Sequence, residues 1–167
     1  VVCITMFDDD EPICEMVESA SYIKDRATLF FTGNYKKVYK EKDKIDLERK
    51  GAFFCGFVDE LTYQSMLAHS DVIVVLTKKD YILNCGAYEA LAARKPLILS
   101  KTSTLMTYFC NGPIYVNPKN PDNIYEAIKY ALDNSVKLKK RIESCKEKLS
   151  DSWDADFRYT LHKLGWH

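Results

Sequence analysis

One segment of the sequence, residues 71–100, constrains the fold more than any other. Two runs of apolar, largely β-branched residues, Val72–Leu76 and Leu97–Leu99, fit strands that are covered on both faces, as in a parallel sheet. Between them the sequence predicts a helix that begins at Gly86 and carries Glu89 in its first turns. The start of such a helix presents unpaired backbone N–H groups to an anion. A carboxylate beside it is typical of nucleotide sites at the carboxyl ends of parallel strands.

The same residues allow a simpler interpretation, in which Glu89 lies on the surface and Gly86 only permits close packing against a strand. Asn84 favours a binding site, because it is a good residue for capping the helix start. Two further breaks, Gly33-Asn34 and Gly56-Phe57-Val58, each follow a predicted strand. Because the carboxyl ends of parallel strands share one edge, we expect the three breaks to form a ligand crevice there.

Strands and helices are expected to alternate along the whole chain. Strands are predicted at Val1–Met6, Leu29–Thr32, Phe53–Cys55, residues 71–77, Leu97–Ser100 and Ile114–Val116. Helices are predicted over residues 13–23, 60–70, 86–91, 105–109, 121–132, 136–149 and 153–164, with a weak helix within 36–50 and with Asp10 capping the first helix. This order implies an α/β fold with a doubly wound parallel sheet. We expect one domain over residues 1–150 and a separate helical tail over residues 151–167.

Composition narrows the class of protein. Lys plus Arg equals Asp plus Glu at 24 each, so there is no overall basic field to recruit nucleic acid. No apolar run is long enough to span a bilayer, so no transmembrane segment is expected. The chain begins with Val1 and shows no charged leader, which suggests a lobe excised from a longer protein. Six scattered cysteines without Cys-x-x-Cys pairs predict free thiols in a reducing cytoplasm rather than a zinc site.

An acidic cluster, Asp8–Glu11, follows the first predicted strand. With the helix after it, the cluster resembles the opening of response-regulator receiver domains, where acids hold magnesium beside a phosphorylated aspartate. Phe53–Cys55 should then supply that aspartate and does not. The alternative is a solvated helix start that the helix dipole stabilises, and we expect no metal. No catalytic residue stands out, since neither a nucleophile nor an acid/base pair is visible.

Taken in order, several motifs resemble the donor-binding C-terminal lobe of a GT-B fold, retaining-type glycosyltransferase of the glycosyl transferases group 1. The resemblance covers residues 1 to about 135. The motifs are Phe31-Thr32-Gly33-Asn34, Gly56-Phe57-Val58 with Glu60-Leu61, Tyr63 and Ser70-Asp71, then Gly86-Ala87-Tyr88-Glu89-Ala90-Leu91, Lys95-Pro96-Leu97-Ile98-Leu99-Ser100, and the helix at Pro121.

The resemblance implies a Rossmann-like lobe that binds a nucleoside diphosphate sugar, with no cofactor or metal. Glu89 would hold the ribose hydroxyls, and the backbone of residues 84–86 would approach the diphosphate and the sugar. Phe57 and Val58 would border the base. The acceptor would be held by a missing N-terminal lobe, which would also make any contact with a membrane, and this lobe alone would be inactive. The predicted site comprises Gly33, Asn34, Phe57, Val58, Lys78, Asp80, Asn84, Cys85, Gly86, Ala87 and Glu89.

Two departures from the family pattern leave other functions open. The first acid of the family's paired-Glu motif is Tyr81 here, and the neighbouring Asp80 is the substitute that we expect for the sugar contact. The basic residues that normally follow the first strand are replaced by acids, so Lys78, Lys79 or another lobe would have to neutralise the diphosphate. The alternatives are a nucleotide-sugar epimerase lobe, a receiver-like regulatory module, and a non-catalytic nucleotide-binding or protein-interaction module.

Overall fold

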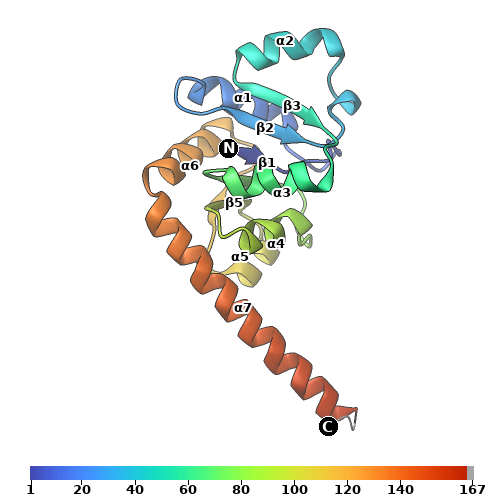
Figure 1. Cartoon of the computed structure of the whole chain (residues 1–167), viewed down its shortest axis with the longest axis vertical. Helices are drawn as coiled ribbons and strands as arrows, with labels where there is room; N and C mark the ends of the chain where they lie inside the picture. Colours follow the sequence, from blue (N-terminus) through green and yellow to red (C-terminus); the bar gives the residue numbers. More distant parts are fainter. Residues whose placement is uncertain (165–167) are drawn as a thin grey trace.

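Six parallel strands form a single sheet at the centre of the molecule (Figure 1). A computed structural model describes residues 1–164 of the chain. The strands are β1 (Val2–Cys3), β2 (Leu29–Thr32), β3 (Ala52–Gly56), β4 (Ile73–Val75), β5 (Leu97–Ser100) and β6 (Ile114–Val116). Their order across the sheet is β3-β2-β1-β4-β5-β6. The predicted doubly wound parallel α/β fold is confirmed.

The strand order separates the Rossmann-like interpretation from the receiver-like one. The order 3-2-1-4-5-6 is that of dinucleotide-binding folds, whereas receiver domains have the order 2-1-3-4-5. In the observed sheet β1 lies between β2 and β4, and β3 is an edge strand. The receiver-like alternative is therefore wrong. In the observed order the direction of winding reverses between β1 and β4, and ligands bind at such a reversal.

Helices cover both faces of the sheet, and each strand supplies both layers because successive side chains alternate. On one face, α1 (Ile13–Ile23) and α6 (Pro121–Asp133) pack on residues such as Val74. On the other face, α3 (Glu60–His69), α4 (Cys85–Ala92) and α5 (Ser103–Phe109) pack on residues such as Val75. Because both faces of the sheet are buried, β4 and β5 are apolar at almost every position.

The segment after β2 contains a 3₁₀ turn, Tyr35–Lys37, and a short charged helix, α2 (Glu41–Arg49). None of the residues of α2 is buried, which agrees with the weak helix that the sequence predicts.

The region after β1 differs from the prediction in two ways. The first strand is Val2–Cys3 rather than Val1–Met6, because the chain leaves the sheet to form the loop before α1. Asp10 does not cap α1: the residue at the cap position is Pro12, and no side chain caps the helix. The Asp10 carboxylate instead accepts a hydrogen bond of 2.9 Å from the Thr77 hydroxyl at the end of β4.

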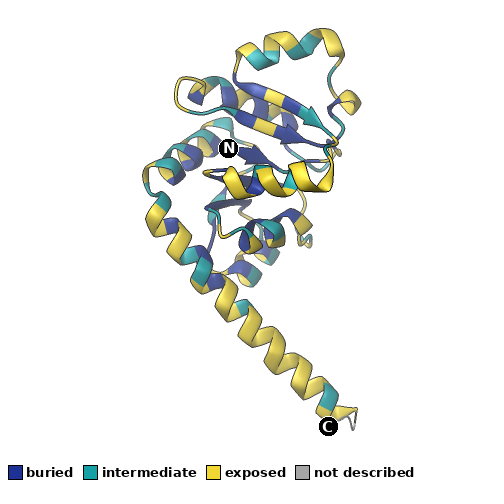
Figure 2. Cartoon of the chain, viewed as in Figure 1, coloured by how far each residue is buried: buried dark blue, intermediate teal, exposed yellow. Residues whose placement is uncertain are grey.

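The C-terminal segment is one continuous helix, α7 (Ser135–Lys163), rather than the two helices that the sequence suggests. The boundary predicted at residue 150 therefore lies inside a helix. The first half buries Leu138, Ile142 and Cys145 against the body. The second half extends away from the body, and residues 151–160 are all exposed (Figures 1 and 2). Residues 165–167, the end of the predicted tail, lie outside the described part of the chain.

Within residues 1–164, no helix combines the length and the apolar character needed to cross a bilayer.

Candidate functional site

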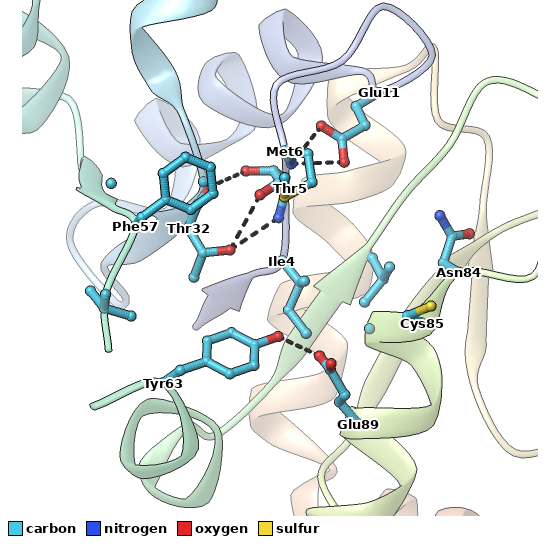
Figure 3. Close-up of a pocket in the computed structure, with 15 residues that line it drawn as sticks. Ile4, Thr5, Met6, Glu11, Thr32, Phe57, Tyr63, Asn84, Cys85 and Glu89 are labelled. Carbon is cyan, nitrogen blue, oxygen red and sulfur yellow. Dashed lines mark hydrogen bonds between the residues drawn. The ribbon is translucent and has the colours of Figure 1, made fainter. Parts of the chain in front are cut away.

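A pocket of about 310 Å³ opens at the carboxyl ends of the central strands, beside the point where the winding of the sheet reverses (Figure 3). Its walls come from the loops after β1, β2 and β3 and from the first turns of α3 and α4. The lining residues are Ile4, Thr5, Met6, Glu11, Thr32, Gly33, Gly56, Phe57, Val58, Tyr63, Val75, Asn84, Cys85, Gly86 and Glu89.

The floor of the pocket is held by contacts between the ends of β1 and β2. The Thr5 N–H donates to the Thr32 hydroxyl at 3.2 Å, and the Thr5 hydroxyl donates to the Thr32 carbonyl at 2.6 Å. Gly33 follows with a φ of +86°, a conformation that side chains disfavour. A Cβ at Gly33 would lie 2.1 Å from the Thr5 carbonyl oxygen, so only glycine allows the two strand ends to approach this closely.

Helix α4 begins at the pocket, with Asn84 in the cap position. The backbone N–H groups of Cys85 and Gly86 have no partner among residues 1–164, which leaves them free for an anion. The Asn84 side chain makes no capping hydrogen bond, contrary to prediction, and its Oδ1 is buried without a partner in the described part of the chain. A Cβ at Gly86 would lie 2.9 Å from Ile4 Cγ2. Gly86 therefore also permits α4 to pack closely against Ile4, as the simpler interpretation of the sequence proposed.

Glu89 lies one turn further along α4 and lines the pocket. The Tyr63 hydroxyl of α3 donates a hydrogen bond to Glu89 Oε2, as Figure 3 shows. Burial, and then this hydrogen bond, raise the pKa of Tyr63, so the hydroxyl remains a donor at physiological pH. Glu89 Oε1 accepts no hydrogen bond from the described residues. The carboxylate is therefore fixed in position and keeps one oxygen for a ligand.

The loop after β3 forms the remaining wall with Gly56, Phe57 and Val58. Gly56 has a φ of +70°, which turns the chain into the pocket. Phe57 is 71% exposed and lies at the rim of the pocket. An exposed ring at the rim can stack against a planar group such as a base.

The charged side chains that line the pocket are both carboxylates, Glu11 and Glu89, and no Lys or Arg is among the described lining residues. The Glu11 carboxylate accepts hydrogen bonds from the backbone N–H groups of Met6 and Asp8 at 3.0–3.1 Å. Burial raises the pKa of Glu11, although these backbone hydrogen bonds oppose the shift. No group of three or more His, Cys, Asp or Glu residues within 1–164 is arranged to hold a metal ion.

Four predicted site residues do not line the pocket: Asn34, Lys78, Asp80 and Ala87. Ala87 is buried in the core beneath α4. Lys78 is exposed in the loop after β4, where its N–H donates to the Asp10 carbonyl. The Asp80 carboxylate accepts hydrogen bonds from the Ser103 hydroxyl and from the Thr104 and Tyr81 N–H groups, which lower its pKa.

The remaining predicted residues, Gly33, Phe57, Val58, Asn84, Cys85, Gly86 and Glu89, meet in this pocket. Sequence reasoning missed Glu11, Thr5 and Ile4 as lining residues, and it included Tyr63 in a motif without placing it in the site. Thr32 had a usable signal, because it ends a predicted strand directly before Gly33. Glu11 also had a signal, because it follows the first predicted strand, but the acidic cluster was interpreted as solvated. Tyr63 had none, since its contact with Glu89 joins residues far apart in the sequence.

The fold is similar to those of several solved structures. HepE from Anabaena, solved in complex with UDP, has a TM-score of 0.78 at 13% identity, over 97% of this chain and 48% of that one. Sucrose-phosphate synthase from Thermosynechococcus elongatus has a TM-score of 0.75 at 18% identity, over 98% of this chain and 45% of that one. The C-terminal domain of LpcC from Francisella tularensis, a glycosyl transferase group 1 family protein, has a TM-score of 0.68 at 19% identity. The match covers 90% of this chain and 84% of that one.

The chain has the fold of one GT-B lobe, and it spans about half the length of HepE and 42% of a glycosyltransferase from Rickettsia africae. No curated protein matches it in sequence. Residues 10–148 match the model of the family described as glycosyl transferases group 1, so the match begins later and ends later than the segment that the sequence motifs suggested. Because this match covers most of the chain, the protein belongs to the glycosyl transferases group 1 family.

Proposed function

We propose that this lobe binds a nucleoside diphosphate sugar in the pocket at the carboxyl ends of β1–β4, for transfer of the glycosyl group to an acceptor. The observation that carries the proposal is the pairing, in one pocket, of the free N–H groups at the start of α4 with the fixed Glu89 carboxylate. The N–H groups suit a phosphate, and Glu89 Oε1 suits a ribose hydroxyl. The UDP complex of HepE supports the same class of ligand.

The acceptor would be held by a second lobe, and the proposed reaction would take place between the two. The length of the structural relatives supports this, since the chain corresponds to about half of HepE. Transfer from a nucleotide donor develops charge on the departing diphosphate, so stabilising that charge contributes more than a strong nucleophile. We propose that the lobe alone is inactive, and that the two-lobe enzyme works in the cytoplasm without a cofactor or metal.

Calorimetric titration of the chain with UDP-glucose, GDP-glucose and ADP-glucose tests this proposal. We expect saturable binding with one ligand per chain for at least one of the three. The position of Phe57 at the rim predicts that the base decides which donor binds. If none of the three binds at millimolar concentration, the transferase and epimerase interpretations both fail.

One observation favours a second candidate, a nucleotide-binding module that does not catalyse transfer. None of the described lining residues is a Lys or Arg that would neutralise the diphosphate. Incubating the full-length protein with its preferred donor separates the two candidates. Release of the sugar to water or to an acceptor supports the transferase, whereas tight binding without release supports the module.

The accessible thiol of Cys85 offers an independent probe of occupancy. Cys85, Cys14 and Cys110 are exposed, and of these three only Cys85 lines the pocket. Burial raises the pKa of Cys3 to about 12, so that thiol should not react. At a donor concentration ten times Kd, alkylation of Cys85 by iodoacetamide should slow about tenfold, because only the free fraction reacts.

Peptide mass spectrometry measures this protection, with Cys14 and Cys110 as internal controls in the same sample. Equal rates at Cys85 with and without a donor that binds would place the ligand elsewhere.

A further inference from the structure

In the loop between β1 and α1, backbone N–H groups point toward a single position that suits an anion. Phe7 has a φ of +60°, an uncommon conformation for a large side chain. Its ring is buried, at 2% exposure, and lies 5.8 Å from the ring of Phe54 and 6.5 Å from that of Phe31. Packing of the ring therefore holds the backbone in this conformation. Left-handed turns of this kind direct neighbouring N–H groups toward one point and bind anions.

A carboxylate of the chain itself occupies this position. The Met6 N–H lies 3.1 Å from Glu11 Oε1 and 3.0 Å from Oε2, and the Asp8 N–H lies 3.1 Å from Oε2. Figure 3 shows the carboxylate directly beside Met6. Both Met6 and Glu11 line the same pocket as the start of α4. The pocket therefore has two sets of anion-binding N–H groups, at the β1 loop and at α4, and Glu11 fills the first.

The charges around Glu11 do not cancel its own. Asp10 lies next to it and is hydrogen-bonded to Thr77, and Asp8 pairs with Lys37. Glu89 is the other charged residue of the pocket. The Lys37 ammonium is already used by Asp8, so no cation among the described lining residues offsets the Glu11 carboxylate.

We infer that the Glu11 carboxylate occupies the second anion subsite of the donor pocket and so weakens the binding of a diphosphate. The inference rests on the proposed function. Two anions cannot share one set of N–H groups, and like charges in close proximity cost free energy. A donor diphosphate must displace the Glu11 side chain or use the α4 subsite alone.

The variant Glu11→Gln tests this inference, because the amide keeps a hydrogen-bond acceptor and loses the charge. We expect about tenfold tighter binding of UDP-glucose, GDP-glucose or ADP-glucose, whichever binds, a change of about 1.4 kcal/mol. The affinity for inorganic pyrophosphate should rise by a similar factor. The affinity for the matching uncharged nucleoside should change less than twofold. Glu147→Gln, at an exposed position of α7, is the matched control and should change nothing.

The dependence of donor affinity on pH gives a second readout, and its wild-type measurement does not depend on the variant. The diphosphate of a nucleotide sugar keeps its charge between pH 5 and pH 8, because it has no free phosphate terminus. Burial raises the pKa of Glu11, so its proton binds as the pH falls through that raised value and the N–H groups become available. Wild-type affinity for the donor should therefore rise toward low pH. The affinity of Glu11→Gln should stay flat, so that the two converge.

The outcomes separate this inference from the function on which it rests. Equal or weaker donor binding by Glu11→Gln, with wild-type binding intact, overturns the inference and leaves the proposed function standing. An equal gain for the uncharged nucleoside overturns it as well. If Glu11→Gln does not fold, a flat wild-type pH profile overturns it and a rise toward low pH supports it. If neither protein binds any donor, the proposed function fails and the inference fails with it.

Discussion

The variant Gly33→Ala is expected to lose about 3 kcal/mol or more of unfolding free energy. Two independent causes add at this position. The φ of +86° is strained for any residue with a side chain, and the new Cβ would lie 2.1 Å from the Thr5 carbonyl oxygen. The obstacle is backbone, which cannot rotate away as a side chain can. Relief would require β1 and β2 to separate, which breaks the hydrogen bonds between Thr5 and Thr32.

The matched control is Gly56→Ala. Gly56 has a similar φ of +70°, but no atom lies within 4 Å of the position that its Cβ would take, so only conformational strain remains. That strain costs about 1 kcal/mol. Urea unfolding, monitored by circular dichroism, measures the unfolding free energy of both variants. Equal losses for the two variants would show that the contact between Gly33 and Thr5 does not hold the strand ends together.

The variant Glu89→Ala is expected to weaken donor binding about a hundredfold, equivalent to about 3 kcal/mol. The substitution removes a charged acceptor that Tyr63 fixes in position, and with it the proposed contact to the ribose. Tyr63→Phe should weaken binding less, by about tenfold, since it removes the positioning hydrogen bond and keeps the carboxylate.

Glu60→Ala is the matched control for Glu89→Ala. Its carboxylate is exposed on α3, where it accepts a hydrogen bond from Gln64, and it does not line the pocket. Calorimetry on the three variants should give wild-type affinity for Glu60→Ala only. Wild-type affinity of Glu89→Ala would show that Glu89 has no part in donor binding.

The fold could be predicted from the sequence because its signals are local. The apolar runs at β4 and β5 show burial on both faces, and the glycines at 33, 56 and 86 show where strands end and where α4 begins. The extent of α7 could not be predicted in this way. Its apolar positions continue past residue 150, but the helix leaves the body there, so the pattern no longer reports contact with the sheet.

The site was predictable only at strand ends and at the start of α4. Gly33 and Phe57 directly follow β2 and β3, Gly86 lies in the first turn of α4, and all three line the pocket. Asp80 was expected near the sugar, but Ser103 and Thr104, more than twenty residues further along the chain, hold its carboxylate.

Glu11 was expected at a solvated helix start. Instead it lines the pocket, and its carboxylate accepts hydrogen bonds from Met6 and Asp8 in the β1 loop. In that loop Phe7 has a positive φ, and its ring packs against Phe31 and Phe54. Contacts so distant in sequence leave no local signal.

The central claim, that a nucleotide sugar binds where the strand ends meet the start of α4, has one direct test. Glycine amides occupy their own region of a ¹⁵N–¹H correlation spectrum, which makes them convenient reporters. Gly33, Gly56 and Gly86 line the pocket, whereas Gly51 and Gly112 do not. During titration with the donor that binds, we predict saturable shifts of the first three resonances and constant positions for Gly51 and Gly112. Shifts at Gly51 or Gly112, with the other three unchanged, would contradict the claim.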